Sequence, residues 1–294
     1  MIQEIAPRRF DNHYQAAAPG PDDYVLHYAA NATFRGADAN RVRGNGMLAA
    51  EVEGRLVLPR LKDYAKAPQT VYLFSIDEER FFLAVDVLAE AREPFQYLSI
   101  SSCRFFMPRY LAFAAGPGVQ LGDWRQHNRY CGVCATPLVH APRSRELVCP
   151  ACGNIVYPRI NIGVIVAIVD GERLLLTKYA GRPIKHYALV AGYTEVGETL
   201  EECCRREIME EVGLQVKDLT YVTNQPWSFT DTLLVGYFAR LDGPADLKVD
   251  HGELKLAEWI ERRDLPKEHE DTSSMTNWMI ELFAKGEDPF SRQR

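Results

Sequence analysis

Residues 192–214 read GYTEVGETLEECCRREIMEEVGL and form the most informative segment of the chain. Thr199, followed three residues later by Glu202, is a capping box of the kind that begins a helix. Gly213 is typical of a helix end, because glycine adopts the left-handed conformation without steric cost. The segment therefore predicts a helix over residues 199–212, preceded by a tight loop around Gly192 in which the backbone can approach a ligand closely.

The predicted helix carries three glutamates on one face. Glu207, Glu210 and Glu211 lie at positions i, i+3 and i+4, which share one side of an α-helix. Neighbouring carboxylates repel one another unless cations lie among them, and hard oxygen ligands suit Mg²⁺ or Mn²⁺ far better than Zn²⁺. A solvated acidic face is the common alternative for glutamates on a helix.

The spacing Gly192-x5-Glu198-x7-Arg206-Glu207-Ile208-x-Glu210-Glu211-x-Gly213-Leu214 matches every fixed position of the Nudix box. The chain thus resembles the Nudix hydrolases, which cleave a nucleoside diphosphate linked to another group. The resemblance implies that the three glutamates hold divalent cations and that a backbone carbonyl of Ala191 or Gly192 is a further ligand. It also implies a structural ion pair between Glu198 and Arg206, which would fix the loop against the helix.

A further acidic residue, Glu253, stands in the turn before a predicted strand over residues 254–260. The resemblance makes it a candidate additional ligand or general base. A solvated loop glutamate is the alternative. The four catalytic candidates are therefore Glu207, Glu210, Glu211 and Glu253.

Four of the seven cysteines have the spacing of a zinc ribbon. Cys131-x2-Cys134 is followed after fourteen residues by Cys149-x2-Cys152, and each pair lies on a short turn that contains glycine or proline. Two such turns can present four thiolates to one Zn²⁺ at about 2.3 Å. All four positions are then filled by protein, so we expect one structural zinc per chain; four incidental buried thiols are the alternative.

A zinc ribbon directly before a Nudix domain resembles the NADH pyrophosphatase (NAD⁺ diphosphatase) family. That family also carries the array Ser-Gln-Pro-Trp-Pro-Phe-Pro-x-Ser shortly after the box, and residues 224–232 here read NQPWSFTDT. Aromatic rings offer stacking faces, and a glutamine amide can read a carboxamide or a base edge. The resemblance implies a substrate pocket formed by Tyr157, Tyr193, Gln225, Trp227, Phe229, Thr232 and Thr276.

The activity implied by this resemblance is hydrolysis of the diphosphate of NADH or NAD⁺ to nicotinamide mononucleotide and AMP. Removal of NAD caps from RNA 5′ ends is a related activity of the family, and the resemblance also implies a homodimer. A Nudix hydrolase of ADP-ribose or dinucleoside polyphosphates is the second hypothesis. A non-catalytic nucleotide-binding or nucleic-acid-binding regulator that uses the ribbon is the third, although a binding module has no need of a costly carboxylate cluster.

Composition limits the remaining classes of protein. The 294 residues carry 34 Lys+Arg and 40 Asp+Glu, a formal charge of −6, which argues against a protein held on nucleic acid mainly by phosphate contacts. No stretch approaches the ~18–20 apolar residues of a membrane span. The first residues lack the apolar region of a signal peptide, so we expect a cytoplasmic protein without membrane partners.

The pattern of strands and helices predicts an α/β (α+β) chain. The resemblance further implies an N-terminal β-rich Nudix-like domain over residues 1–126, a four-cysteine zinc ribbon over 127–158 and a catalytic Nudix domain over 159–294, an α/β/α sandwich with a mixed sheet. In the first domain the expected strands are 55–58, 71–74 and 81–85, in a small antiparallel sheet, with a helix over 107–115 that ends at Gly116-Pro117-Gly118. In the last domain the expected strands are 160–169, 173–177, 218–223, 232–240 and 254–260, and the expected last helix covers residues 271–285.

Overall fold

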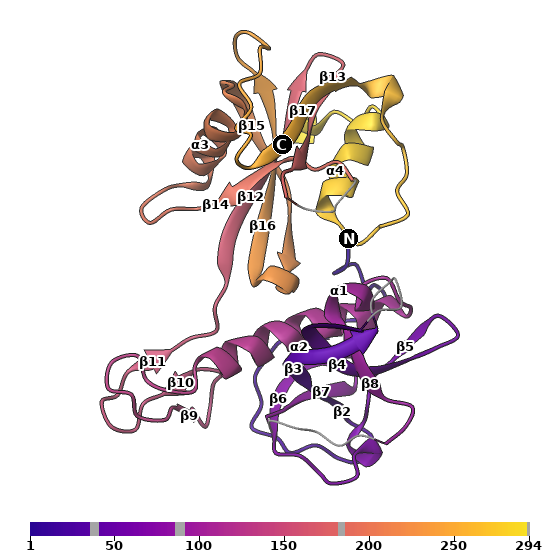
Figure 1. Ribbon diagram of the computed structural model, residues 1–294, viewed down its shortest axis with the longest axis vertical. Coiled ribbons are helices and arrows are strands. Elements are labelled where there is room, and N and C mark those ends of the chain that lie inside the picture. The colour runs from indigo at the N-terminus through magenta and orange to yellow at the C-terminus, as the bar shows by residue number, and fades with distance from the viewer. Residues whose placement is uncertain (36–40, 86–91, 182–185, 293–294) are drawn as a thin grey trace. The chain divides into compact units, whose positions relative to one another are not determined.

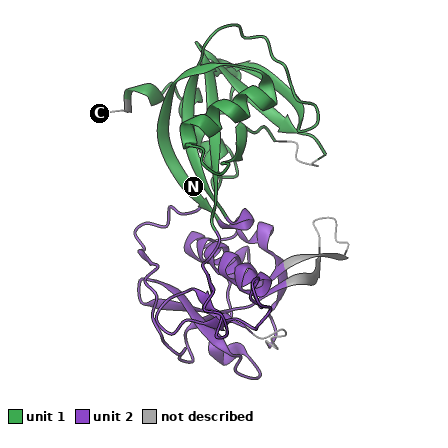
Figure 2. Ribbon diagram, turned by 90° about the vertical axis from the view of Figure 1, so that its left-hand side faces the viewer, with its two compact units in different colours: residues 1, 160–227, 232–294 green, residues 2–159, 228–231 purple. Residues whose placement is uncertain are grey.

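The computed structural model describes residues 1–35, 41–85, 92–181 and 186–292. The chain divides into two compact units (Figure 2). The N-terminal unit comprises residues 2–159 together with 228–231, and the C-terminal unit comprises residue 1 together with 160–227 and 232–294. Within the described residues, none of the helices has the length and apolar composition needed to cross a membrane.

A mixed sheet forms the centre of the C-terminal unit. Among the described residues it has six strands in the order β15-β16-β12-β13-β17, with β14 paired to β12. Strands β12 and β16 run parallel, and the other neighbours are antiparallel. The strands are β12 (Asn161–Asp170), β13 (Arg173–Tyr179), β14 (Val190–Tyr193), β15 (Val216–Trp227), β16 (Thr232–Leu241) and β17 (Leu254–Glu261).

Helix α3 (Leu200–Val212) and helix α4 (Met275–Ala284) cover opposite faces of this sheet (Figure 1). The central strand β12 is apolar along most of its length because it is buried on both faces. Its alternate residues Val164, Val166 and Ile168 enter the core with α3. The intervening Ile165, Ala167 and Val169 enter the core with α4. The predicted α/β/α sandwich with a mixed sheet is therefore confirmed.

The predicted helix over 199–212 is also confirmed, with its capping box. The Thr199 side chain accepts a hydrogen bond from the Glu202 backbone N–H, and the Glu202 carboxylate accepts from the Thr199 N–H at 2.8 Å. Gly213 ends the helix with φ +70°. Two expectations for this unit were wrong. Gly192 lies on strand β14 rather than in a loop, and α4 starts after Ser274, because residues 271–274 form a turn closed by Asp271. Among the described residues of this unit, two short 3-10 turns follow the strands, η3 (Arg262–Asp264) and η4 (Pro289–Arg292). The 3-10 turn η2 (Ser228–Thr230) at the end of the β15–β16 hairpin is grouped with the N-terminal unit.

Ahead of the cysteine segment, the described residues of the N-terminal unit form two β-sheets and the long helix α2 (Arg109–His127). One sheet has the order β1-β6-β7-β2, and the other has β3-β4-β5 with β8 paired to β4. The elements are β1 (Phe10–Asp11), β2 (Tyr24–Leu26), β3 (Tyr28–Arg35), β4 (Arg41–Val52), β5 (Arg55–Val57), η1 (Leu61–Asp63), β6 (Thr70–Ile76), β7 (Glu79–Ala84), β8 (Gln96–Ser99) and α1 (Ile100–Cys103). The strands predicted at 55–58, 71–74 and 81–85 correspond to β5, β6 and β7.

Two expectations for the N-terminal unit were also wrong. Strands β2 and β7 are parallel, so the sheet is not purely antiparallel. Helix α2 continues through Gly116-Pro117-Gly118 instead of ending there. The physical reason is close packing: a Cβ added at Gly118 would lie 2.7 Å from Leu26 Cδ1 and closer still to the Tyr28 hydroxyl. These glycines admit neighbouring side chains and do not mark a boundary.

The cysteine segment belongs to the same compact unit. It forms a three-stranded sheet among the described residues, in the order β11-β10-β9, from β9 (Val139–His140), β10 (Leu147–Val148) and β11 (Ile155–Val156). The Arg145 guanidinium donates to the backbone and side-chain oxygens of Asn12 at 2.8 Å, which ties the ribbon to the N-terminal segment. A separate domain boundary at residues 126–127 stays a prediction.

Candidate functional site

The four predicted zinc ligands converge. The Sγ atoms of Cys131, Cys134, Cys149 and Cys152 all lie within 4.8 Å of one another, and three of the pairs are 3.4–3.6 Å apart. Tetrahedral bonds of about 2.3 Å would place thiolates about 3.8 Å apart, so this donor set fits Zn²⁺. Four protein sulfurs leave no position for water, and the site is structural in character.

The two halves of the cysteine site have the same backbone geometry. The backbone N–H of Cys131 donates to the Thr136 carbonyl and that of Cys149 donates to the Asn154 carbonyl, both at 2.8 Å. The residue after each second cysteine is left-handed: Ala135 has φ +60° and Gly153 has φ +76°. Glycine tolerates this conformation and alanine is strained in it, so the first turn is held by its surroundings.

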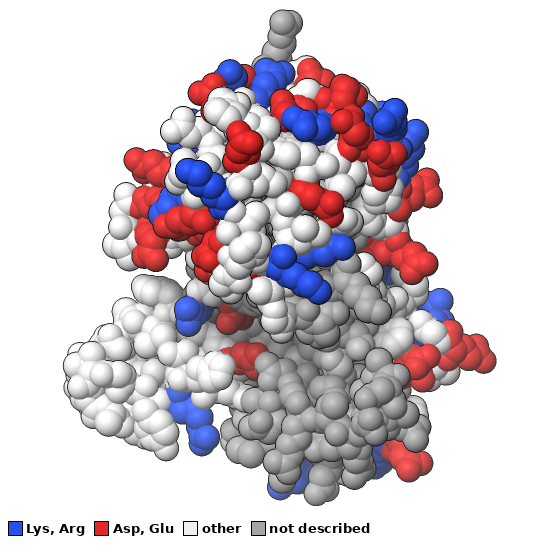
Figure 3. All heavy atoms as spheres, turned by 45° about the horizontal axis from the view of Figure 1, so that its top comes forward, with Lys and Arg blue, Asp and Glu red and all other residues white. Residues whose placement is uncertain are grey.

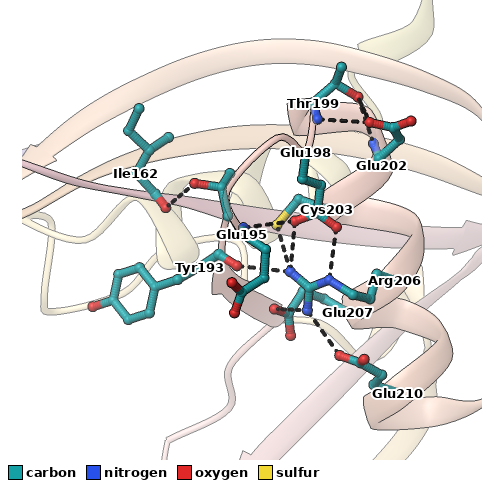
Figure 4. A network of polar contacts seen from close by, with 11 residues as sticks. Ile162, Tyr193, Glu195, Glu198, Thr199, Glu202, Cys203, Arg206, Glu207 and Glu210 are labelled. Carbon is teal, nitrogen blue, oxygen red and sulfur yellow. Dashed lines mark hydrogen bonds and ion pairs between the residues drawn. The ribbon is translucent and has the colours of Figure 1, made fainter.

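Arg206 is the centre of a polar network between α3 and the strand that precedes it (Figure 4). Its Nε and Nη2 donate to the two carboxylate oxygens of Glu198 at 2.8 and 2.9 Å. Nη2 also donates to the Tyr193 carbonyl at 2.9 Å. The expected ion pair between Glu198 and Arg206 is therefore present, and it is bidentate. The hydrogen bonds from Arg206 lower the pKa of Glu198 to about 2.

The same guanidinium holds two of the candidate metal ligands. Arg206 Nη1 donates to Glu207 Oε1 at 2.7 Å and to Glu210 Oε2 at 2.9 Å, so both carboxylates point toward one atom (Figure 4). Glu207 is almost buried, whereas the Glu210 side chain is 59% exposed. Burial raises the pKa of Glu207, and Arg206 opposes this rise without cancelling it.

Glu211 occupies a different environment. It is 2% exposed, and its Oε2 has no hydrogen-bond partner. Burial and the charge of Glu207 raise its pKa to about 8, while a hydrogen bond from the backbone of Ala191 acts in the opposite direction. The charge of Glu253 contributes to the raised pKa values of both Glu207 and Glu211.

These carboxylates fit a divalent cation. A buried carboxylate oxygen without a partner costs free energy unless a cation or donor compensates it, and hard oxygen donors suit Mg²⁺ and Mn²⁺. Among the described residues, the four cysteines are the only group whose ligand atoms already lie within 4.8 Å of one another. Glu207 and Glu210 instead bind Arg206, so a cation would have to draw them away from that guanidinium.

Gly192 is required by the position of Glu207. Strand β14 pairs with β12, which sets Gly192 opposite Val164, and the Glu207 carboxylate lies over the glycine. A Cβ added at Gly192 would lie 1.9 Å from Glu207 Cδ. The adjacent Ala191 carbonyl and the Gly192 carbonyl stay candidate ligands.

Five of the predicted substrate residues belong to the C-terminal unit, and Tyr193, Trp227, Thr232 and Thr276 keep some exposure or a polar partner there. The Tyr193 ring is 52% exposed, and its hydroxyl lies 3.1 Å from Thr232 Oγ1. Trp227, half-buried at the end of β15, is paired with Thr232 across the hairpin. Thr276 lies half-buried in the first turn of α4.

Gln225 and Phe229 already have contacts within the protein, and their role in substrate binding stays a prediction. Gln225 is 1% exposed; its amide donates to the Ser273 carbonyl at 2.8 Å and accepts from the Met275 N–H at 2.9 Å. Phe229 belongs to the N-terminal unit and packs against its hydrophobic core. Tyr157, also in that unit, is 67% exposed. The amide of Gln225 is thus occupied by the protein itself.

One acidic residue near the glutamates was missed from the sequence. The Asp250 N–H donates to the Glu211 carbonyl at 2.9 Å, and the charge of Asp250 contributes to the raised pKa of Glu211. Its backbone, with that of Lys248 bonded to the Val212 carbonyl, satisfies the end of α3. No local signal distinguishes Asp250 from other loop acids, because its role depends on the fold.

Comparison with known proteins places these features in order along the chain. A NADH pyrophosphatase zinc ribbon domain matches residues 126–157, and a NUDIX domain matches residues 158–280. The NAD-capped RNA hydrolase NudC of Chromobacterium violaceum is 37% identical over 184 residues, which are 63% of this chain and 68% of that protein. The protein of the same name from Shigella flexneri is 39% identical over 152 residues, 52% of this chain and 59% of that protein. A crystal structure of a NUDIX hydrolase from Nitrosomonas europaea covers 54% of this chain and 92% of its own, with 19% identity and a TM-score of 0.45.

Proposed function

The chain belongs to the NudC family of Nudix hydrolases that carry a NADH pyrophosphatase zinc ribbon, and on that premise we propose that it hydrolyses the diphosphate of NADH or NAD⁺. The products are AMP and nicotinamide mononucleotide, reduced or oxidised as in the substrate. Removal of an NAD cap from an RNA 5′ end is the same reaction on a longer substrate. This chain matches the two NudC proteins over 68% and 59% of their own length. The activity of the whole protein is inferred from the matched part.

The observation that carries the proposal is the cluster of carboxylates around Glu207 and Glu211, the two buried glutamates of the Nudix box. Glu211 has an unpartnered oxygen, Glu207 is buried beside it, and Glu253 adds a third charge. Such an arrangement does not stabilise a helix that has only a structural role, because every buried charge without a partner destabilises the fold. A phosphate-cleaving site needs it to hold divalent cations.

The residues that would hold the cations are Glu207, Glu210, Glu211 and Glu253, with a carbonyl of Ala191 or Gly192. When bound, Mg²⁺ or Mn²⁺ polarises the diphosphate and neutralises the charge that develops during phosphoryl transfer. In the reaction, a water oxygen bonds to one phosphorus while the bond from that phosphorus to the bridging oxygen breaks. The bridging oxygen leaves with the other phosphate, which gives two monophosphates.

The chain's own residues position these groups. Glu198 and Arg206 fix β14 against α3, so that the backbone at Ala191 and the glutamates keep one geometry. Glu253 stands at an exposed turn, where it can accept a proton from the attacking water. The exposed ring of Tyr193 offers a stacking face for a base.

The surface suits a dinucleotide or a short RNA end rather than a long nucleic acid. On the face drawn in Figure 3, the described Lys and Arg side chains alternate with Asp and Glu, without a continuous basic patch. With a net charge of −6, recognition of a capped end depends on local contacts near the diphosphate. The homodimer implied by the family stays part of this proposal.

ADP-ribose is the second candidate substrate, for a specific reason. The Gln225 amide, expected to read the nicotinamide carboxamide, already bonds Ser273 and Met275. A site in which no other group recognises the carboxamide accepts any nucleoside diphosphate whose base stacks on an aromatic side chain, and ADP-ribose is such a compound.

Product analysis tests the proposed function. Purified protein with Mg²⁺ or Mn²⁺ is expected to convert NADH to equal amounts of AMP and reduced nicotinamide mononucleotide. In ¹⁸O-labelled water, one of the two products carries the label. Glu210→Gln is expected to lose about 100-fold or more in kcat/KM, since it removes a candidate ligand. Glu268→Gln, an exposed loop glutamate, is the matched control and is expected to retain activity. Absence of AMP from the wild-type reaction would contradict the proposal.

A further inference from the structure

Glu253 lies in an exposed turn between α3 and β17, and one residue joins this turn to the helix. The Asp250 N–H donates to the Glu211 carbonyl at 2.9 Å. Glu211 belongs to α3 and is 2% exposed, so this hydrogen bond attaches the turn to a buried residue of the helix. All three residues belong to the C-terminal unit, so the attachment is a contact within that unit.

The same residue also closes the turn. Asp250 Oδ1 accepts a hydrogen bond from the Gly252 N–H at 2.8 Å. The Asp250 carbonyl accepts from the Glu253 N–H at 3.2 Å and from the Leu254 N–H at 2.8 Å. A side-chain oxygen bonded to the backbone N–H two residues later forms an Asx turn, which aspartate and asparagine adopt readily. Three successive N–H groups, at residues 252–254, therefore have Asp250 as their acceptor.

The sheet fixes the other side of the turn. The N–H of Ala180, which follows β13, donates to the Glu253 carbonyl at 2.8 Å. Leu254 begins β17 and is fully buried in the core that the sheet forms with α3. The turn is also tightly packed, because a Cβ added at Gly252 would lie 3.1 Å from Asp250 Oδ1. The backbone of Glu253 is thus bonded at its N–H to Asp250 and at its carbonyl to the end of β13.

We propose that Asp250 is a positioning residue for Glu253, which holds the turn closed and fixes it to the end of α3. The role requires an acceptor oxygen in the side chain of residue 250 and no negative charge, because the partner of Oδ1 is a neutral backbone N–H. A direct ligand of the divalent cation is the alternative role for an acidic residue here, and that role depends on the carboxylate charge. The inference rests on the proposed function for its kinetic consequences, since Asp250 affects the reaction only through Glu253.

The first test separates the turn from the charge. Asp250→Asn keeps the acceptor oxygen and removes the charge, whereas Asp250→Ala removes both. We expect Asp250→Asn to keep kcat for NADH within about threefold of wild type and Asp250→Ala to lower it about tenfold or more, because a misplacement of about 1 Å in a catalytic group costs up to about 100-fold. KM for NADH is expected to stay within about twofold in both variants, because Glu253 acts in the reaction step.

The control for this test is Asp246→Ala, which changes an exposed aspartate of the same connection and is expected to keep the wild-type kcat. Equal losses of kcat in Asp250→Asn and Asp250→Ala would show that the charge matters rather than the turn, and would overturn the proposal.

The second test is a double-mutant cycle between Asp250 and Glu253. A residue that acts only through Glu253 has no further effect once the Glu253 carboxylate is removed. The kcat of the double variant Asp250→Ala with Glu253→Gln is therefore expected to lie within about twofold of that of Glu253→Gln alone. Losses that multiply in the double variant would show that Asp250 acts independently of Glu253, and would overturn the proposal.

A measurement without substrate separates this inference from the proposed function. Asp250→Ala removes the acceptor of the Gly252 N–H, so amide hydrogen exchange at residues 252–254 is expected to accelerate about threefold or more, whereas Asp250→Asn is expected to exchange as wild type does. Unchanged exchange in Asp250→Ala would refute the positioning role even if the enzyme hydrolyses NADH. Conversely, wild-type protein that fails to hydrolyse NADH, together with faster exchange in Asp250→Ala, refutes only the proposed function.

Discussion

Replacement of Gly192 by alanine is the sharpest perturbation of the proposed site. The new Cβ would lie 1.9 Å from Cδ of Glu207 and 2.1 and 2.2 Å from its two oxygens. Ordinary carbon contacts begin at 3.4 Å, so the carboxylate must retreat by about 1.5 Å or β14 must separate from α3. A misplacement of about 1 Å in a catalytic group costs on the order of 100-fold in rate, and we expect a loss of that size in kcat/KM for NADH.

The assay is steady-state hydrolysis of NADH at saturating Mg²⁺, with the thermal midpoint measured on the same samples. We expect the overpacking to destabilise the C-terminal unit by about 1–3 kcal/mol. Gly20→Ala is the control, because its Cβ would meet its nearest atom at an ordinary 3.5 Å. Gly192→Ala combined with Glu207→Asp shortens the crowded side chain and is expected to recover the thermal midpoint but not the activity. A Gly192→Ala enzyme within about threefold of the wild-type rate would refute the reasoning.

Three further predictions concern the zinc site and Arg206. Cys149→Ala is expected to abolish binding of one zinc per chain and to lower the thermal midpoint of the N-terminal unit, as measured by metal release and calorimetry; retention of the zinc would contradict the ligand assignment. Arg206→Lys is expected to lose about 10-fold to 100-fold in kcat/KM, because an ammonium cannot form the bidentate pair with Glu198 and also bridge the other carboxylates. The pKa of Glu198, near 4.5 unfolded and about 2 folded, implies stability that is present above pH 4.5 and lost as the pH falls toward 2. The thermal midpoint of Glu198→Gln should therefore lie further below wild type at about pH 6 than at about pH 3; an equal deficit at both pH values would argue against the ion pair.

The parts of the fold predicted from the sequence are those set by local chemistry. The helix over 199–212 was predicted because its capping box and its terminal glycine act within a few residues. The cysteine site was predicted because the two ligands of each pair are separated by only two residues and the turn geometry is short-range. The sandwich was expected from the resemblance to the Nudix hydrolases, and the long apolar strand β12, buried on both faces, agrees with that expectation.

The errors lie where distant residues decide the structure. Helix α2 passes through Gly116-Pro117-Gly118, which resembles a boundary, because the side chains of Leu26 and Tyr28 need the space above the glycine. A glycine that permits a turn and a glycine that permits close packing cannot be distinguished from neighbouring residues alone.

The substrate pocket was the least predictable part. Gln225 has the chemistry to read a carboxamide, but its partners lie 48 and 50 residues further along the chain and occupy both ends of the amide. Phe229 has the chemistry to stack, but its ring packs against a hydrophobic core. By contrast the ring of Tyr193, on strand β14, is 52% exposed, and its stacking role stays a prediction.

The central claim is that this chain hydrolyses the diphosphate of nicotinamide dinucleotides, and the most direct measurement compares substrates. Values of kcat/KM are determined for NADH, NAD⁺, ADP-ribose and an NAD-capped RNA with Mg²⁺ or Mn²⁺, with Glu210→Gln as the blank. The account predicts that the nicotinamide-bearing substrates are cleaved with at least about tenfold higher kcat/KM than ADP-ribose, and that the blank is inactive on all four. Equal or faster cleavage of ADP-ribose would contradict it.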